Sequence, residues 1–411
     1  SATGDAAGTG GEVEEIVFAS WTINSPPTEE GLQAVEDAIN EITIPEIGVK
    51  VDYQVYPVAE YPQKVALELQ SGGTIDLFCC ACNFQSNLSD DMFYDITDLV
   101  DECLPDVKEL LPEDWWDGVT FQGKVVAVPA WLPTAAYVNF CYRSDIADGL
   151  ELDIDSVKSV EDLTPILAQV KEAYPEMYPL IGGNGGFGGI TAATYSIPDV
   201  DLMGDNPYMP AGVLIGDSDT VVNLFETEEY AERMALVRDW YEKGYIMQDL
   251  ATTTLTNIDI FASGNAFGQI TGQGSHPDYV GTNASNQTGY PLKSIMLSEP
   301  SIAESGVVNQ CFAVASTSKR PEAALKFLNM TYCNADIANL ISWGIEGRDY
   351  VVNEDGTVQP PEGFDSASVP YPGGYMNYGS MYSGLEYPAV GTSLELSLIH
   401  ISEPTRRSYI S

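Results

Sequence analysis

Hydrophobic and polar positions along the first eighty residues follow two periods, one typical of strands and one of helices. Residues 15–21 form an apolar, β-prone run, and residues 49–56 place every second apolar side chain on one face. Between these runs, residues 29–42 carry apolar side chains at helical spacing. Residues 61–70 repeat the helical spacing, and residues 74–78 form a third apolar run. The order strand, helix, strand, helix, strand predicts a parallel α/β lobe.

Similar patterns recur further along the chain. Residues 226–243 place apolar side chains on one helical face and stop at Gly244, a typical glycine after a helix end. Residues 312–315 form a short apolar run that predicts a strand. A chain of 411 residues suits two lobes, each large enough to bury its own core.

The charge is strongly one-sided and excludes some partners. The chain has 17 Lys and Arg residues against 61 Asp and Glu residues, a net charge of −44. Such a surface repels phosphate backbones and anionic lipid headgroups, so we expect no nucleic-acid binding. No run of 18 or more apolar residues exists, so no segment is expected to span a membrane.

The cysteines and histidines do not predict a metal or redox centre. Cys79 and Cys82 have C-x-x-C spacing, but a structural zinc site needs about four ligands, and the chain has two His residues. The run from Leu77 to Cys82 is instead typical of a buried strand that leads into a loop. No calcium loop of the form D-x-D-x-D-G with a closing Glu occurs. We therefore expect no metal, cofactor or catalytic residue.

Several short motifs together resemble one known family. Residues 344–350 read GIEGRDY, and they follow a segment at 318–328 that contains PEAALKFL. Residues 73–78 and 123–129 add two weaker motifs of the same family in the expected order. The set resembles the family-1 extracellular solute-binding proteins of ABC importers, above all their lipoprotein, sugar-binding branch.

The resemblance implies an α/β, two-lobed periplasmic-binding-protein-like fold of type II. Each lobe would be a sheet flanked by helices, with hinge crossovers near Pro129, Gly272 and Ala315. The implied boundaries are a flexible linker at 1–12, lobe 1 at 13–129 and 272–315, lobe 2 at 130–271 and 316–396, and a non-native tail at 397–411. Hinge closure over a cleft between the lobes would hold the solute.

The same resemblance implies a receptor without enzymatic activity that captures a carbohydrate, specifically an oligosaccharide, and delivers it to the permease. Sugars are recognised by aromatic platforms and planar polar side chains. Trp21 lies at the C-terminal end of the first predicted strand, where open α/β sheets bind ligands. The candidate ligand-binding residues are Trp21, Asn83, Gln85, Trp131, Asn184, Gln273, Trp343 and Glu346.

Two alternatives stay open from the residues themselves. The same fold would also suit a polyamine, a peptide or another non-sugar solute, since an acidic site with Trp rings can bind cations. A secreted glycan hydrolase would need two carboxylates that flank one glycosidic bond. In a chain with 61 acidic residues, the occurrence of such a pair is no evidence for an enzyme. Expected partners are the permease subunits of the importer and, through a lipid anchor upstream of the chain, the membrane. The chain is expected to be monomeric and to lie on the extracellular face of the membrane or in the periplasm.

Overall fold

The computed structural model describes most of the 411-residue chain. The described residues are 13–22, 25–81, 83–132, 137–182, 200–202, 212–216, 218, 220–250, 252–253, 255–274, 277–298, 307–308, 310–354, 356–364, 368–373, 379–380 and 383–385. The linker predicted at 1–12, the tail predicted at 397–411 and the candidate residue Asn184 lie outside them. Among the described residues, no helix combines the length and apolar character needed to cross a membrane.

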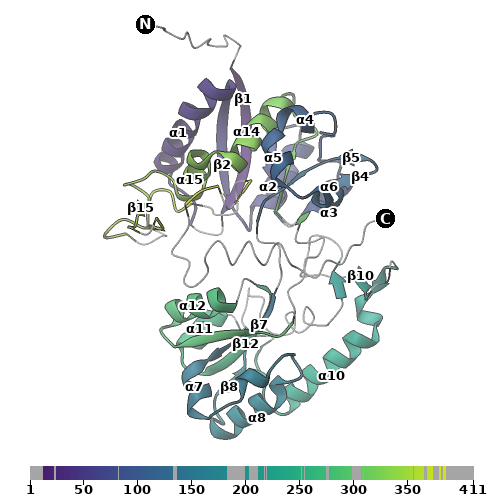
Figure 1. Ribbon diagram of the computed structural model, residues 1–411, viewed down its shortest axis with the longest axis vertical. Coiled ribbons are helices and arrows are strands. Elements are labelled where there is room, and N and C mark those ends of the chain that lie inside the picture. Colours follow the sequence, from purple (N-terminus) through teal and green to yellow (C-terminus); the bar gives the residue numbers. More distant parts are fainter. Residues whose placement is uncertain are drawn as a thin grey trace. The chain divides into compact units, whose positions relative to one another are not determined.

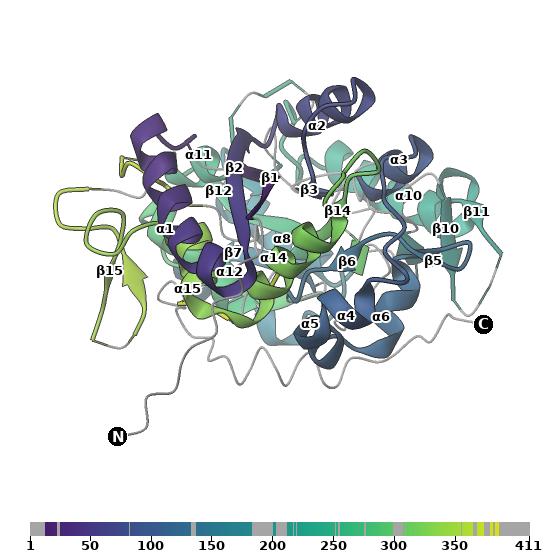
Figure 2. The ribbon, with the colours of Figure 1, turned by 90° about the horizontal axis from the view of Figure 1, so that it is seen from above.

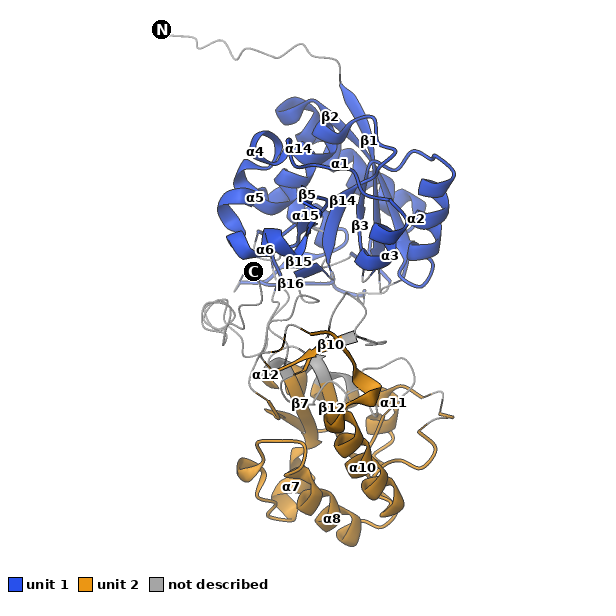
Figure 3. Cartoon of the chain, turned by 90° about the vertical axis from the view of Figure 1, so that its right-hand side faces the viewer, with its two compact units in different colours: residues 1–132, 307–388 blue, residues 133–306, 389–411 orange. Residues whose placement is uncertain are grey.

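The chain folds into two units, and each is built from separated segments of the sequence (Figure 3). The first unit takes its described residues from 1–132 and 307–388, and the second from 133–306. Each unit has its own hydrophobic core, since the large buried cluster around Phe18 and the cluster around Phe140 belong to different units. The pattern-based expectation of two α/β lobes is confirmed.

The first unit alternates strands and helices along its N-terminal part (Figure 1). Its strands are β1 (Glu14–Thr22), β2 (Val49–Pro57), β3 (Leu77–Cys79), β4 (Thr120–Phe121), β5 (Lys124–Val125), β6 (Val128–Pro129), β14 (Cys311–Val314), β15 (Val351–Val352) and β16 (Val358–Gln359). Its helices are α1 (Glu29–Ile47), α2 (Tyr61–Gln70), α3 (Phe84–Ser89), α4 (Val100–Cys103), α5 (Pro105–Leu110), α6 (Glu113–Gly118), α14 (Pro321–Cys333) and α15 (Ala335–Trp343).

A five-stranded sheet in the order β2-β1-β3-β14-β6 is the centre of this unit. Strands β1, β2 and β3 are parallel, and β14 runs antiparallel to β3 and β6. Helices α1, α14 and α15 lie together on one side of β1 and β2, and α2 lies on the other (Figure 2). Phe18 packs between Phe312 and Phe327, with ring centroids 6.3 and 5.6 Å away, so strand and helix side chains share one core.

The described residues of the second unit form two smaller sheets. Its strands are β7 (Tyr137–Arg143), β8 (Tyr178–Leu180), β9 (Val200–Leu202), β10 (Gly212–Ile215), β11 (Val222–Asn223), β12 (Ala266–Gly274) and β13 (Leu292–Met296). Its helices are α7 (Ser144–Gly149), the 3-10 helix η1 (Ile154–Ser156), α8 (Leu163–Ala173), the 3-10 helix η2 (Leu224–Glu226), α10 (Glu228–Glu242), α11 (Asn257–Ala262) and α12 (Pro277–Thr288). One sheet has the order β13-β7-β12-β8 and the other β11-β10-β9.

The predicted boundaries in the second half of the chain are wrong. Residues 272–306 were assigned to lobe 1, yet β13 pairs with β7 inside the second unit. Residues 316–396 were assigned to lobe 2, yet α14 packs against β1 and β14 inside the first unit. The reason is that the apolar face of α14 fills the core beside Phe18, so the chain stays in the first unit after β14.

The GIEGRDY motif has a structural role in the first unit. The Asp349 carboxylate accepts hydrogen bonds from the backbone N–H groups of Ile345 at 2.8 Å and Tyr371 at 3.1 Å, and it pairs with Arg348 at 2.5 Å. Arg348 also donates to the carbonyl of Gly31 in α1 at 3.2 Å. The motif therefore joins the turn after α15 to α1 and to the segment at 368–373.

Candidate functional site

One edge of the five-stranded sheet gathers several of the predicted ligand-binding residues. Strands β1, β3 and β6 all end there, because they run in the same direction, and antiparallel β14 begins there. The edge residues include Trp21 at the end of β1, Asn83 after β3, Trp131 after β6 and Gln310 before β14. Open α/β sheets bind ligands outside the carboxyl ends of their strands, so this edge is the candidate site of the first unit.

Trp21 stands at the predicted place but is buried. Its side chain is 5% exposed and belongs to the core of the first unit. The indole Nε1–H donates to Cys79 Sγ at 3.4 Å, and the Cys79 thiol donates to Gln310 Oε1 at 3.5 Å. This series of contacts crosses β1, β3 and the start of β14. It fixes the position of Gln310, whereas a stacking role for the Trp21 ring stays a prediction.

The turn between β3 and α3 presents Asn83 and Gln85. Ala81 has a φ of 45°, in the left-handed region, and this bend carries the chain from the strand into α3. Asn83 is partly exposed, and its Nδ2 donates to the carbonyl of Ala81 at 2.6 Å, which holds the amide in place. Gln85 is exposed on the first turn of α3. Both side chains lie near the carboxyl end of β3, as predicted.

Trp131 is the partly exposed aromatic residue of this edge. Its ring centroid lies 5.1 Å from that of buried Trp115, with the rings inclined by 49°. Its backbone N–H donates to the carbonyl of Gly379 at 2.6 Å. Trp115 therefore packs against one side of the Trp131 ring, and the hydrogen bond to Gly379 holds the Trp131 backbone in place. A supported and partly exposed indole is suited to stacking on the CH face of a sugar.

A C-terminal segment links this edge to Trp343. Ser380 forms a β-bridge with Trp131, and Leu385 accepts a hydrogen bond from Trp343 Nε1 at 2.8 Å through its carbonyl. Thr22 at the end of β1 donates to the carbonyl of Gly373 at 3.3 Å. Gly373, Ser380 and Leu385 thus contact the end of β1, the end of β6 and the end of α15, respectively.

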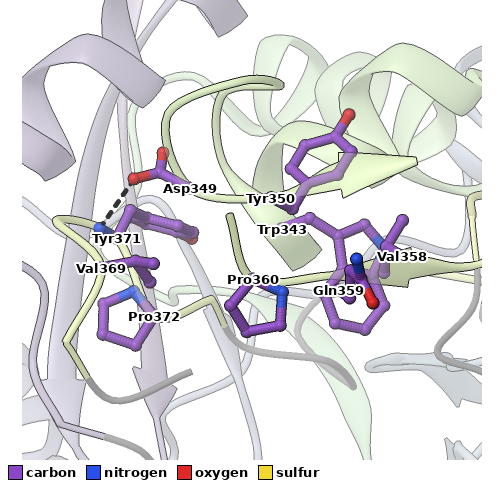
Figure 4. Close-up of a pocket in the computed structure, with 9 residues that line it drawn as sticks. All are labelled: Trp343, Asp349, Tyr350, Val358, Gln359, Pro360, Val369, Tyr371 and Pro372. Carbon is purple, nitrogen blue, oxygen red and sulfur yellow. Dashed lines mark hydrogen bonds between the residues drawn. The ribbon is translucent and has the colours of Figure 1, made fainter. Parts of the chain in front are cut away.

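The cavity beside Trp343 is too small for a sugar (Figure 4). It measures about 10 Å³, and Trp343, Tyr350, Gln359 and Pro360 are among its lining residues. That volume admits about one water molecule. Glu346 is exposed in the turn that follows α15. A ligand contact of Trp343 or Glu346 stays a prediction that this cavity does not support.

The candidate residues of the second unit are less completely described. Gln273 belongs to β12, but its side chain lies outside the described residues, as does all of Asn184, so a ligand contact of either stays a prediction. Within the described part of the chain, no group of three or more His, Cys, Asp or Glu side chains is arranged to hold a metal ion.

Sequence reasoning missed Gln310 and the role of Trp115. Gln310 precedes β14 in a segment without a motif, and its carbonyl accepts the N–H of Ala130 at 3.2 Å. Trp115 lies in α6, and its contact with Trp131 depends on the approach of α6 to the end of β6. Neither contact leaves a local signal in the sequence.

Comparisons with known proteins agree with this architecture. The sequence model of the bacterial extracellular solute-binding proteins matches residues 30–332, which is more than half of the chain. The chain therefore belongs to the family of bacterial extracellular solute-binding proteins. The resemblance inferred from the motifs is confirmed.

The individual relatives and solved structures described next share about a quarter or less of their residues with this chain. A carbohydrate ABC transporter substrate-binding protein of Streptococcus pneumoniae is 25% identical over 356 residues, covering 85% of this chain and 68% of that protein. The N-glycan transport solute-binding protein NgtS from Streptococcus pneumoniae matches with a TM-score of 0.77 at 22% identity, covering 95% of this chain and 83% of the other. Its complex with Man5GlcNAc matches with a TM-score of 0.67 at 23% identity, with the same coverage. These structures establish the two-lobed solute-binding fold.

Proposed function

We propose that this protein is the receptor of an ABC importer and captures an oligosaccharide, which it delivers to the permease subunits without chemical change. The supported Trp131 indole at the carboxyl edge of the sheet carries this proposal, because it offers a rigid apolar face beside polar side chains. Asn83 and Gln310 lie at the same edge and offer planar amides for hydrogen bonds to hydroxyl groups.

The relatives support a carbohydrate as the ligand. One relative is a carbohydrate transporter component, and NgtS has been solved with Man1GlcNAc and with Man5GlcNAc. A saccharide with mannose and N-acetylglucosamine is therefore the first ligand to test. Attachment to the membrane through a lipid, a monomeric state and hinge closure over the ligand remain parts of the proposal.

A thermal-shift screen tests the proposed ligand class. The purified chain would be melted with mono- and oligosaccharides, Man5GlcNAc among them, and with spermidine and a peptide mixture. A ligand that binds only the folded state raises the melting temperature, by an amount that grows with its concentration. We expect a shift with one class of oligosaccharide. A shift with spermidine or peptides alone would agree with a receptor function and contradict a carbohydrate ligand.

A further inference from the structure

The free edge of the sheet in the first unit is only partly covered. Strand β2 is the outermost strand on this side, so every second residue directs its backbone groups away from β1. Asn40 of α1 bonds both outward groups of Val51, donating to the carbonyl at 2.9 Å and accepting from the N–H at 2.7 Å. Glu36 Oε2 accepts the N–H of Tyr53 at 3.0 Å. Helix α1 therefore caps the first half of the edge.

One turn before Glu36 on α1, the Gln33 side chain bonds to its own helix and not to β2. Gln33 donates to Glu36 at 3.1 Å and to Asp37 at 3.0 Å on its own helix. Consequently the next outward groups of β2 are the carbonyl of Tyr53 and the N–H and carbonyl of Val55, and none of the described residues forms a hydrogen bond with them. The next residue of β2 that faces outward is Pro57, which has no N–H. Tyr53 is buried, so the N–H and carbonyl of partly exposed Val55 are the two groups that stay available at this part of the edge.

A groove lies beside these two groups. Its volume is about 320 Å³, and its walls are the flank of α1, with Glu29, Leu32 and Glu36, and the second half of β2, with Asp52, Val55 and Tyr56. Exposed backbone groups beside an open groove are the arrangement by which a sheet accepts an additional strand from another chain. The groove thus has the shape and the hydrogen-bonding groups for an extended peptide.

The charges and rings around the groove select among possible occupants. Its walls carry the carboxylates of Glu29, Glu36 and Asp52 and no Lys or Arg. A second copy of the chain would bring the same carboxylates together, which like-charge repulsion opposes. A sugar would lack a free platform, because the Tyr56 ring is covered by Lys64 Nζ at 4.9 Å from its centroid, and Tyr53 is 2% exposed.

We propose that this groove binds an extended, lysine- or arginine-rich peptide segment of a partner protein, which pairs with β2 as an additional strand. The N–H and carbonyl of Val55 supply the pairing, and the three carboxylates supply the preference for a basic sequence. This groove runs along the outer side of β2, and its proposed occupant is a different class of molecule from the carbohydrate.

Fluorescence anisotropy with a labelled decapeptide of alternating lysine and threonine tests the proposal on the whole chain. We expect saturable binding that weakens as sodium chloride rises. Glu29→Gln should weaken binding about two- to fivefold, and Val55→Pro, which removes one pairing N–H, about tenfold. The control Glu30→Gln changes a neighbouring exposed carboxylate in the same first turn of α1 that does not line the groove, and it should leave the affinity unchanged.

Hydrogen exchange separates strand pairing from diffuse attraction to an acidic surface. Exchange of the Val55 amide should slow on addition of the peptide, and the same peptide with proline in place of threonine should lose this effect. Equal losses in the Glu29→Gln and Glu30→Gln variants, or undiminished binding of the proline peptide, would overturn the proposal. Absence of binding by the lysine–threonine peptide at low salt would overturn it as well.

Discussion

The Ser318 hydroxyl donates a hydrogen bond to Asp76 Oδ1 at 2.5 Å, although the two residues are 242 positions apart in the chain. Both are buried, and Asp76 Oδ2 also accepts the backbone N–H of Val17 at 3.1 Å. One carboxylate therefore joins β1, the start of β3 and the segment that leads into α14. This junction explains why the chain after β14 continues in the first unit.

Removal of the Asp76 carboxylate should destabilise the first unit strongly. Asp76→Ala leaves the buried Ser318 hydroxyl and the Val17 N–H without their acceptor, so we expect a loss of about 2–4 kcal/mol in the free energy of unfolding. Urea unfolding followed by circular dichroism measures the loss. Asp101→Ala, which removes an exposed ion pair with Lys108, should cost less than about 1 kcal/mol. Equal costs for the two variants would contradict this role of Asp76.

Gly344 should not tolerate a side chain. Its φ of 84° and ψ of −138° belong to a region that glycine alone adopts readily, and an added Cβ would lie 2.4 Å from Asp349 Oδ2. Gly344→Ala should cost about 3 kcal/mol or more in unfolding free energy. Gly356 has a similar φ of 85° with open space around it, so Gly356→Ala should cost about 1–2 kcal/mol. A cost of Gly344→Ala no larger than that of Gly356→Ala would refute the clash with Asp349.

The ion pair between Arg143 and Asp145 should make the second unit sensitive to acid. The hydrogen bond from Arg143, with Nη2 and Oδ2 2.6 Å apart, lowers the pKa of Asp145. A carboxyl with a lowered pKa stabilises the fold above its ordinary pKa of about 3.9, and this contribution is lost as the pH falls through the lower folded value. Asp145→Asn should therefore cost about 1 kcal/mol near pH 7, a value reduced by solvent screening, and little near pH 2.

Thermal unfolding of the native chain and the Asp145→Asn variant between pH 2 and pH 7 measures this difference. A stability gap that stayed constant over the whole range would show that Asp145 acts through packing. A gap that closed below about pH 4 is the expected result.

Cys333 should react slowly with alkylating reagents despite its exposure. Partial burial of its sulfur and the neighbouring Asp106 carboxylate raise the pKa of the thiol to about 11. Since the thiolate is the reactive form, the rate with iodoacetamide should rise about tenfold per pH unit between pH 7 and pH 10. Mass spectrometry of the peptide that contains Cys333 gives this rate. A plateau near pH 9 would show an ordinary thiol, and Asp106→Asn should shift the profile toward lower pH.

The local elements of the N-terminal half followed directly from the sequence. The strands predicted at 15–21 and 49–56 correspond to β1 and β2, and the helix predicted at 61–70 corresponds to α2. Periodic apolar positions determine such elements because each must bury one face. The helix predicted at 29–42 continues through Pro45 to Ile47, and Gly48, with a φ of 69°, ends it later than the apolar pattern does.

Contacts between distant segments could not be predicted in the same way. The segment at 318–328 was matched to a family motif but assigned to the wrong lobe, because the bond between Asp76 and Ser318 leaves no periodic signal in either segment. Trp21 was placed correctly at the end of the first strand, yet its burial depends on Cys79 and on the chain that follows β3. Exposure of a single tryptophan is a tertiary property that its neighbours in sequence do not determine.

The most direct test of the central claim is calorimetric titration of Man5GlcNAc, or of the oligosaccharide that the thermal screen selects, into the native chain and into Trp131→Ala. The account predicts saturable binding by the native chain and a loss of about tenfold or more in affinity for Trp131→Ala. Trp116→Ala, which truncates the neighbouring tryptophan of α6 without removing Trp115 or Trp131, should bind as the native chain does. If Trp131→Ala bound the oligosaccharide with native affinity, the proposed site would be contradicted, whether or not Trp116→Ala bound more weakly.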